Sequence, residues 1–295
     1  MRKILVTLMC FMMLLSGCVN NNVEVKDDLS NKTQQEENAQ DKKDESQETS
    51  DEQTKDTQEN KQEKQDDVEV NKQPQVDNTS VLYQKIIVID AGHGLNSYND
   101  YEPIGPGSSE MKIMFASGTS GANQTEEELN LKVALKLQKV LEQKGAIIHM
   151  TRTTHESDMT NVDRAEFAND LNADLSVKIH ADGVDATSAH GVSVLIPGRA
   201  YIQDEELLAN SRLAAEHVLN KFVEKTGAYN RGIVVRNDLT GFNWSTVPII
   251  LIEMGFMTNP EEDRLMETEE YQDKMVAGMV EGIEEYFKQI DGSGD

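Results

Sequence analysis

The sequence predicts a single layered α/β domain with a largely parallel sheet, placed after a long N-terminal segment that lacks a core. Short apolar runs rich in Val and Ile alternate with longer amphipathic segments from about residue 85 onward, a pattern typical of strands connected by helices. Several of these runs are continuous, as expected for strands that are buried on both faces. The 215 residues from position 81 are enough to form one hydrophobic core.

The chain begins with a short apolar segment of the secretory type. Residues 4–15 follow two basic residues; the run is too short for a stable membrane-spanning helix but has the length of a signal-peptide core. It ends in Leu15-Ser16-Gly17-Cys18, which resembles the lipobox of bacterial lipoproteins. This resemblance implies that residues 1–17 are removed and that Cys18 carries lipid. The alternative is an ordinary signal peptide that is cleaved nearby.

Residues 18–80 predict a disordered polar tether that carries a folded domain away from the membrane. The first 80 residues contain 10 Lys and Arg against 18 Asp and Glu, and no aromatic residue occurs between Val19 and Ser80. Such a segment cannot bury enough apolar surface to offset the entropy lost on folding. A flexible chain of this length spans on the order of 45 Å on average. We therefore expect the folded domain at residues 81–290 and a flexible tail at 291–295.

The net charge of −25 and the cysteine content exclude several classes of function. Nucleic-acid binding requires basic surfaces, so we expect no nucleic-acid partner. Electrostatic docking onto anionic lipids or wall polymers is disfavoured for the same reason. Cys10 would leave with the signal peptide and Cys18 would carry lipid, so that a metal site must use His, Asp or Glu.

The first strand of the domain, residues 86–89, consists of four β-branched apolar residues. It ends at Gly92-His93-Gly94, where two glycines permit a sharp turn beside the imidazole. The connection that follows, residues 95–125, is rich in Gly and Ser, and we expect it to lack regular structure. Because loops of this length are usually functional or disordered, its place after His93 favours a flap over a site.

A capping box predicts that the first helix begins after Thr125. The Thr125 hydroxyl can cap the helix while Glu128, three residues later, returns the hydrogen bond. Apolar residues then recur at helical spacing until Lys144-Gly145. The charge preference of a helix N-terminus explains part of the acidic triplet Glu126-Glu127-Glu128. A helix start is also a place from which one carboxylate can point towards the end of a strand.

The rest of the domain continues the alternation of strands and helices. The expected strands are 146–151, 175–180, 191–196, 231–235 and 247–252. The expected helices begin near Asn161, cover 204–226, begin again after Asn259, and cover about 270–289.

Three strands of the predicted sheet are followed by, or end in, residues with catalytic chemistry: His93, His180 and Glu253. The carboxyl ends of parallel strands meet at one edge, so these groups and a glutamate of the helix start could converge there. Two imidazoles and one carboxylate form a common catalytic zinc site with an open position for water. The remaining carboxylate, on an apolar strand, would have a raised pKa suited to proton transfer. The alternative is a set of unconnected loop residues.

These residues also occur in an ordered set of motifs that resembles one family of bacterial cell-wall enzymes. The motifs, in chain order, are Ile89-Asp90-Ala91-Gly92-His93-Gly94, Glu126-x-x-Leu129-Asn130-Leu131, Thr151-Arg152, Asp163-Arg164-Ala165 with Ala168-Asn169, Ala173-Asp174, Ile179-His180-Ala181-Asp182, Arg231-Gly232, and Pro248 with Leu251-Ile252-Glu253-Met254-Gly255-Phe256-Met257-Thr258-Asn259-Pro260. Together they resemble the zinc-dependent N-acetylmuramoyl-L-alanine amidases of the amidase-3 type over residues 84–288. Each motif is weak alone, but the ordered set is specific.

The resemblance implies a twisted, mostly parallel mixed sheet of about six strands flanked by helices, in an amidase domain at residues 81–290. It implies one zinc ion bound by His93, Glu126 and His180; the Glu-x-x-Leu-Asn-Leu register, and not spacing, selects Glu126. Glu253 would take a proton from the zinc-activated water and pass it to the leaving group. The expected reaction is hydrolysis of the amide bond between N-acetylmuramic acid and L-alanine.

The chain departs from the family pattern at two positions. Lys178 stands where many members have Ser; it could reach the site or an anionic group of the stem peptide, or it could extend to solvent. His155 stands where members often have Asp, which leaves the role of that position open. Arg231 is a further candidate for substrate contact. The 95–125 segment resembles a longer version in some Gram-positive members, which implies a role in substrate access.

The resemblance also implies partners and a location. We expect peptidoglycan as the substrate, and a monomer held by the lipid on Cys18 at the outer face of the cytoplasmic membrane, next to the cell wall. One alternative is a zinc peptidase that cuts within the stem peptide. Another is a catalytically idle wall-binding lipoprotein or regulator, although all four chemical positions hold competent residues.

Overall fold

The computed structural model describes residues 77–95 and 98–292. The signal peptide predicted at 1–17, the lipid on Cys18, the tether as far as residue 76 and the last three residues lie outside this range. No helix in the described ranges is long and apolar enough to cross a membrane.

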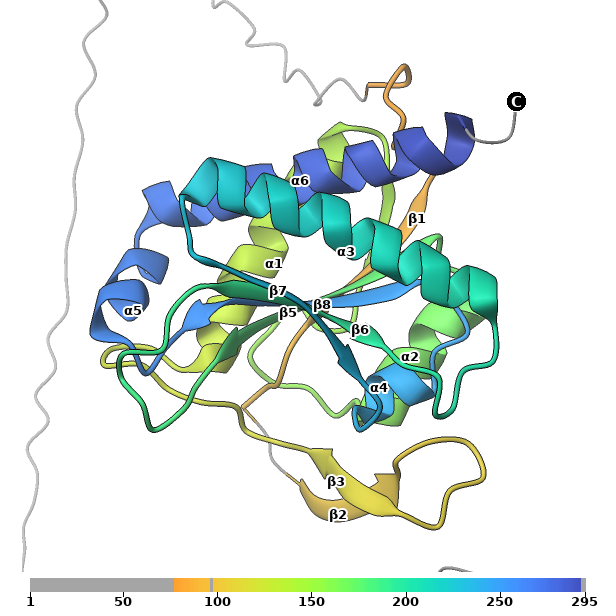
Figure 1. The fold of residues 1–295 in the computed structure, drawn as a ribbon, viewed down its shortest axis with the longest axis horizontal. Coiled ribbons are helices and arrows are strands. Elements are labelled where there is room, and N and C mark those ends of the chain that lie inside the picture. Colours follow the sequence, from red (N-terminus) through yellow and green to blue (C-terminus); the bar gives the residue numbers. More distant parts are fainter. Residues whose placement is uncertain (1–76, 96–97, 293–295) are drawn as a thin grey trace, which may run out of the picture. The chain divides into compact units, whose positions relative to one another are not determined.

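A six-stranded sheet in the order β4-β1-β5-β8-β6-β7 forms the centre of the domain (Figure 1). Its strands are β1 (Ile86–Ala91), β4 (Ile147–Met150), β5 (Leu175–Asp182), β6 (Val192–Pro197), β7 (Asn230–Arg236) and β8 (Ile249–Phe256). All neighbouring pairs are parallel except β6 and β8, which are antiparallel. This confirms the single α/β domain with a mostly parallel mixed sheet of six strands.

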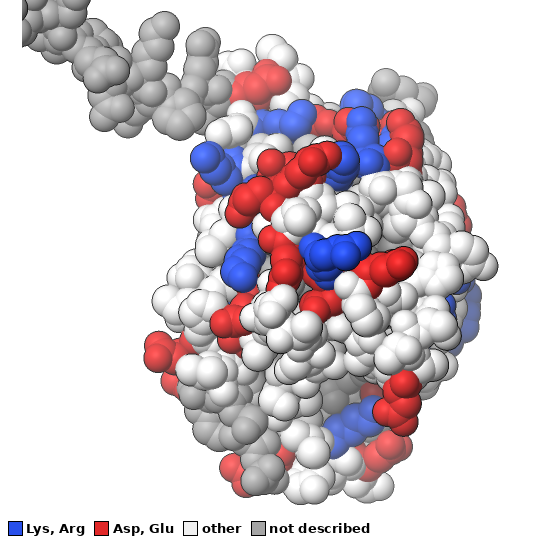
Figure 2. Space-filling view, turned by 90° about the vertical axis from the view of Figure 1, so that its left-hand side faces the viewer, with Lys and Arg blue, Asp and Glu red and all other residues white. Residues whose placement is uncertain are grey.

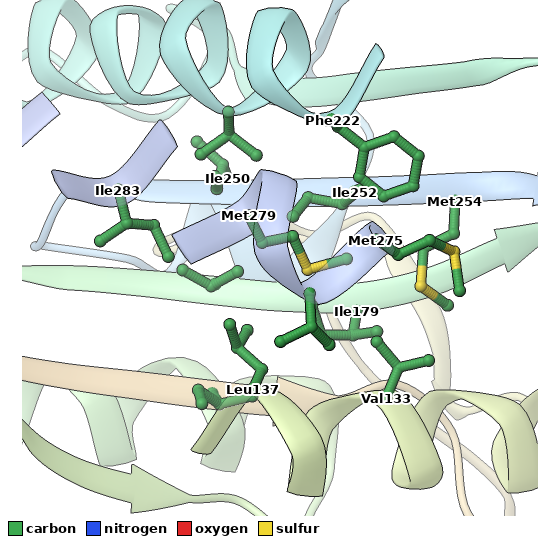
Figure 3. Close-up of a cluster of buried hydrophobic side chains, with 14 of the residues drawn as sticks. Val133, Leu137, Ile179, Phe222, Ile250, Ile252, Met254, Met275, Met279 and Ile283 are labelled. Atoms are coloured by element: carbon green, nitrogen blue, oxygen red, sulfur yellow. The ribbon is translucent and has the colours of Figure 1, made fainter. Parts of the chain in front are cut away.

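Helices cover both faces of this sheet (Figure 1). The helices are α1 (Glu126–Gln143), α2 (Asn161–Asp170), α3 (Glu205–Thr226), α4 (Thr240–Asn243), α5 (Pro260–Met266) and α6 (Glu269–Gly292). Side chains of α1, α3 and α6 pack with Ile179, Ile250 and Ile252 of the sheet in the main hydrophobic core (Figure 3). On the other face, α2 packs on Val88 of β1, and α4 packs on β6 and β8 through Phe242.

Local capping explains where the long helices begin and end. Thr125 accepts a hydrogen bond from the backbone N–H of Glu128, and the Glu128 carboxylate accepts one from that of Thr125, which confirms the predicted capping box. The chain leaves α1 through Gly145, whose φ of +87° suits glycine. Asp204 caps α3, and the left-handed Gly227 ends it.

Helices α3 and α6 approach each other at two glycines of α6. A Cβ atom on Gly278 would lie 2.6 Å from the Cα atom of Phe222, and one on Gly282 would lie 2.5 Å from that of Val218. Only glycine permits this backbone contact, which no sequence periodicity had indicated. At the edges of the helix layer, basic and acidic side chains form pairs such as Lys225 with Glu281. The face drawn in Figure 2 likewise carries both charges side by side.

The prediction that residues 95–125 lack regular structure was wrong. They contain a two-stranded antiparallel sheet of β2 (Tyr98–Pro103) and β3 (Met111–Phe115), which pair only with each other. β2 is mostly polar and ends in Pro103, and the five-residue β3 is largely apolar but interrupted by Lys112, so neither contains the Val- and Ile-rich run by which the other strands were predicted. The short helix α4 was also not predicted.

Strands β5 and β8 continue past their predicted carboxyl ends. His180 lies inside β5, which continues to Asp182, and Glu253 lies inside β8, which continues to Phe256. The two residues are register partners across the β5·β8 pair. Pairing of these strands carries them past their apolar stretches and places the two polar side chains next to each other.

Candidate metal centre and active site

His93 follows β1 in a left-handed conformation with a φ of 61°, which is unusual for a residue with a side chain. The sharp turn therefore depends on the histidine itself and not on the φ angles of its two neighbouring glycines. Gly92 is required for another reason, because a Cβ atom there would lie 2.3 Å from the His180 ring. The Nδ1 atom of His93 lies 2.7 Å from the Ala116 carbonyl oxygen, a contact in which Nδ1 donates and Nε2 is left free to bind a metal.

His93, Glu126 and His180 converge from three separate elements. Glu126 Oε1 lies 3.0 Å from His93 Nε2 and 3.1 Å from His180 Nδ1. One ligand atom from each residue lies within 4.8 Å of the others, and the described residues contain one such His/Cys/Asp/Glu group. Two imidazoles and a carboxylate suit zinc, so this donor set fits the ion that the sequence predicts.

Glu126 is held as an ionised carboxylate at the start of α1. It is 4% exposed, and its oxygens accept hydrogen bonds from the backbone N–H groups of Thr119 (2.9 Å) and Ala181 (3.2 Å). Burial alone would raise its pKa, but the hydrogen bonds with His180 and His93 lower the pKa well below the usual range. Burial also lowers the pKa of His180 to about 4, against the opposing bond from Glu126. Both groups are therefore in the protonation state that metal binding requires.

Glu253 lies beside His93, Glu126 and His180, and its pKa is shifted in the opposite direction from that of Glu126. Burial raises its pKa well above the usual value, and the nearby charges of Glu126 and Asp182 raise it further. Its Oε2 atom is buried and has no hydrogen-bond partner in the described part of the chain. Such a carboxyl group can hold a proton at a pH at which Glu126 is ionised, so the two carboxyl groups can take different roles.

The four predicted residues line one open depression of about 420 Å³. Its other walls come from the segment after β3 and from the end of β5, and the remaining lining residues are Ala116, Ser117, Gly118, Thr119, Ala181, Asp182 and Gly183. The segment at 116–119 thus borders the site, as the sequence predicted for part of the 95–125 connection.

Lys178 is not in this depression and does not extend to solvent. It is 7% exposed, and its ammonium group donates to Asp90 Oδ2. The predictions that Lys178 reaches the site or extends to solvent were therefore both wrong, because its side chain forms a buried ion pair with Asp90. Asp90 also accepts from Arg164 at 2.5 Å and from the Thr151 hydroxyl at 2.6 Å.

Two arginines that sequence reasoning left without a role support the His93 turn. Arg152 donates to the carbonyl oxygens of Ala91 and Gly92, both at 2.8 Å. Arg164 donates to the carbonyl oxygen of His93 at 2.9 Å. Their positions in short sequence motifs could have indicated a role for both arginines. That they support the same turn is evident only in the folded chain.

The other acidic and basic candidates take structural positions. Glu127 contacts His155 at 3.0 Å and lies 3.7 Å from Arg152, which gives His155 a local partner. Arg231 stacks over the Phe256 ring at 4.8 Å and donates to the carbonyl oxygen of His190. Arg231 is on the same edge of the sheet as the site but is not among the residues that line the depression.

Comparisons with known proteins find relatives over most of the folded domain. A family model described as N-acetylmuramoyl-L-alanine amidase matches residues 87–285. The chain is 28% identical over 205 residues to the uncharacterized protein YqiI of Bacillus subtilis, covering 70% of this chain and 86% of YqiI. It is 28% identical over 207 residues to the probable cell wall amidase LytH of Staphylococcus aureus, covering 70% of this chain but only 60% of LytH.

A solved structure is similar over the same region. The N-acetylmuramyl-L-alanine amidase Ami1 from Mycobacterium abscessus is 30% identical to the chain and superimposes with a TM-score of 0.62. The match covers 69% of this chain and 99% of the Ami1 chain.

Proposed function

Because the chain belongs to the N-acetylmuramoyl-L-alanine amidase family, whose model matches residues 87–285, we propose that it uses one zinc ion to cut peptidoglycan at the amide bond between N-acetylmuramic acid and L-alanine. The observation that carries this proposal is the convergence of His93, Glu126 and His180 beside Glu253. Three of these four groups lie close enough together to bind one metal ion, and the fourth, Glu253, has the raised pKa of a proton carrier.

His93, Glu126 and His180 would hold the zinc ion. When bound, zinc polarises the carbonyl group of the scissile amide and lowers the pKa of water towards neutrality. The Ala116 carbonyl keeps His93 in the tautomer that offers Nε2, and the N–H groups of Thr119 and Ala181 keep Glu126 in place.

Glu253 would move the proton. It accepts the proton that the attacking water loses as the new C–O bond forms, and it then donates that proton to the amide nitrogen as the C–N bond breaks. The products are a free lactyl carboxyl group on the glycan and a stem peptide with a free L-alanine amino group. The unpartnered Oε2 of Glu253 and its burial support this role, because a fully satisfied carboxylate would be a weaker base.

Digestion of purified peptidoglycan tests the proposal. Mass spectrometry should find glycan strands without peptides together with intact stem peptides. Shortened stem peptides would instead establish the alternative zinc peptidase, and binding to peptidoglycan without any product would establish an idle wall-binding protein.

Glu253→Gln is the matching variant. It should lower kcat by at least about 100-fold, since general acid–base groups commonly contribute that much, while the protein still binds one zinc ion. Wild-type activity in this variant would refute the role of Glu253.

We further propose that the lipid on Cys18 holds the enzyme at the outer face of the cytoplasmic membrane, as a monomer next to the wall. The supporting observation is the sequence Leu15-Ser16-Gly17-Cys18 after an apolar run. Fractionation of cells that produce the full chain should place it with membranes, and recovery in the soluble fraction would contradict the anchor.

A further inference from the structure

We propose that Asp263 is a positioning residue for the metal centre: its carboxylate holds the loop at residues 116–122 in place, and this loop orients His93 and Glu126. The inference deepens the proposed function and rests on its zinc site. It adds a residue on α5, which contributes no ligand and does not line the depression around His93.

The loop at 116–122 contacts two of the three predicted ligands through its backbone. The Ala116 carbonyl oxygen lies 2.7 Å from His93 Nδ1, and the Thr119 N–H donates to Glu126 Oε2 at 2.9 Å. The Thr119 carbonyl oxygen also accepts from the N–H of Glu126 at 3.0 Å. Partners of this kind fix the tautomer and the direction of a metal ligand, so the loop position decides how well the ligands are preorganised.

This loop packs so closely against the predicted ligands that a small displacement of the loop would also displace them. Gly118 has a φ of +81°, and a Cβ atom there would lie 2.8 Å from Glu126 Oε2 and 2.9 Å from His93 Cδ2. On its other side, Thr119 packs so closely on Gly183 that a Cβ atom on that glycine would lie 2.3 Å from Thr119 Oγ1. Ala116, Ser117 and Gly118 are exposed, so their own burial does not hold the loop.

Asp263 supplies the attachment at the far end of the loop. Its Oδ2 atom accepts a hydrogen bond from the Ala122 N–H at 2.7 Å. Gly121 lies directly on the carboxylate, since a Cβ atom there would be 1.8 Å from Asp263 Oδ1. The N–H of Gly121 donates to the Gln124 carbonyl oxygen and closes a tight turn. The contact of the Asp263 carboxylate with Gly121 and Ala122 in this turn is called the clamp below.

Asp263 is buried at a cost in stability, which favours a functional role for the clamp. The residue is 3% exposed, and its Oδ1 atom is buried without a hydrogen-bond partner in the described chain. An incompletely paired buried carboxylate is destabilising relative to a neutral side chain of similar size. Because α5 follows β8 directly, the clamp also joins the loop to the strand that carries Glu253.

A purely structural role is the competing explanation. Glu261, Glu262 and Asp263 all occupy the first turn of α5, where negative charge stabilises a helix. Glu261 is exposed and, in the described part of the chain, has no hydrogen bond or ion pair with the loop, so Glu261→Ala removes a charge from the same turn and serves as the matched control.

The experiment measures zinc affinity of the metal-free protein by competition with a chromophoric chelator. Asp263→Ala should weaken zinc binding about 10-fold or more, as expected when an outer support of metal ligands is lost. Asp263→Asn, whose side-chain oxygen can still accept from Ala122, should remain close to wild type, and so should Glu261→Ala. Amide hydrogen exchange should rise at Thr119 and Ala122 in Asp263→Ala alone.

Gly121→Ala changes the loop residue that contacts Asp263. This variant provides an independent test of the clamp if Asp263→Ala does not fold. Its methyl group meets the Asp263 carboxylate, so zinc affinity should fall here as well. A folded Asp263→Ala or Gly121→Ala protein with wild-type zinc affinity would overturn the clamp and leave the proposed function intact. A wild-type protein that binds no zinc would overturn both.

Discussion

Replacement of Asp90 by Asn is expected to destabilise the domain strongly. Asp90 is 2% exposed and pairs with two buried cations, Lys178 and Arg164. The carboxamide would remove the negative charge without changing the shape of the side chain. Arg164 would keep carbonyl acceptors at Ala91 and His93, whereas Asp90 is the acceptor described for the Lys178 ammonium group.

The expected loss of stability in Asp90→Asn comes from the Lys178 ammonium group, which would stay buried without a negative partner. Removal of one partner from a buried ion pair typically costs about 3–5 kcal/mol, because the remaining charge is uncompensated. Total stability of a domain is about 5–15 kcal/mol, so Asp90→Asn should remove a large share of it. The effect should also reach His93, because Arg164 joins Asp90 to the turn that carries this residue.

Urea unfolding of wild type, Asp90→Asn, Lys178→Met and the double variant would measure this prediction. The double variant has no buried charge without a partner at this position, so it should be more stable than Asp90→Asn, with an interaction energy above about 1 kcal/mol. Additive effects, or a cost of Asp90→Asn below about 1 kcal/mol, would refute the reasoning.

The pH dependence provides a second check of the same pair. Burial alone would raise the pKa of Asp90, but Lys178 and Arg164 lower this pKa well below the usual value of 3.8 for an aspartate. A carboxyl group whose pKa is lower in the folded state stabilises the fold above its unfolded pKa and loses this contribution as the pH falls. The stability difference between wild type and Asp90→Asn should therefore shrink below about pH 3.8.

The remaining predictions concern the metal centre and the helix layer. His93→Ala should lower zinc affinity by more than the roughly 10–100-fold that loss of an outer partner costs, with an unchanged circular dichroism spectrum. The control His149→Ala, which contacts Phe167 away from the site, should bind zinc like wild type; equal affinity in both variants would contradict the ligand assignment. Gly282→Ala should destabilise the domain by about 1–2 kcal/mol in urea unfolding, because overpacking against Val218 outweighs the better helix propensity of Ala. A gain in stability would show that α3 and α6 can move apart freely.

The metal centre could be predicted in large part because its residues lie in short motifs. His93 follows a buried strand, and His180 and Glu253 lie near the ends of two others, so the parallel topology predicted that they could meet at one edge of the sheet. The choice of Glu126 over Glu127 depended on the family resemblance. The structure gives the physical distinction: Glu126 faces both imidazoles, Glu127 faces Arg152 and His155.

The sequence by itself determined the order of the helices and of the strands of the main sheet, except for the short helix α4, together with the capping box at Thr125, because these depend on interactions between residues close in the chain. It also supplied the candidate ligands through short motifs, although the family resemblance was needed to select Glu126. The tertiary structure alone decided the partner of Lys178, which lies 88 positions away at Asp90, and the attachment of the 116–122 loop to Asp263, 141 positions beyond Ala122. It also decided the backbone contact between Gly282 and Val218. These features are fixed by distances between distant segments, and hydrophobic periodicity carries no information about such distances.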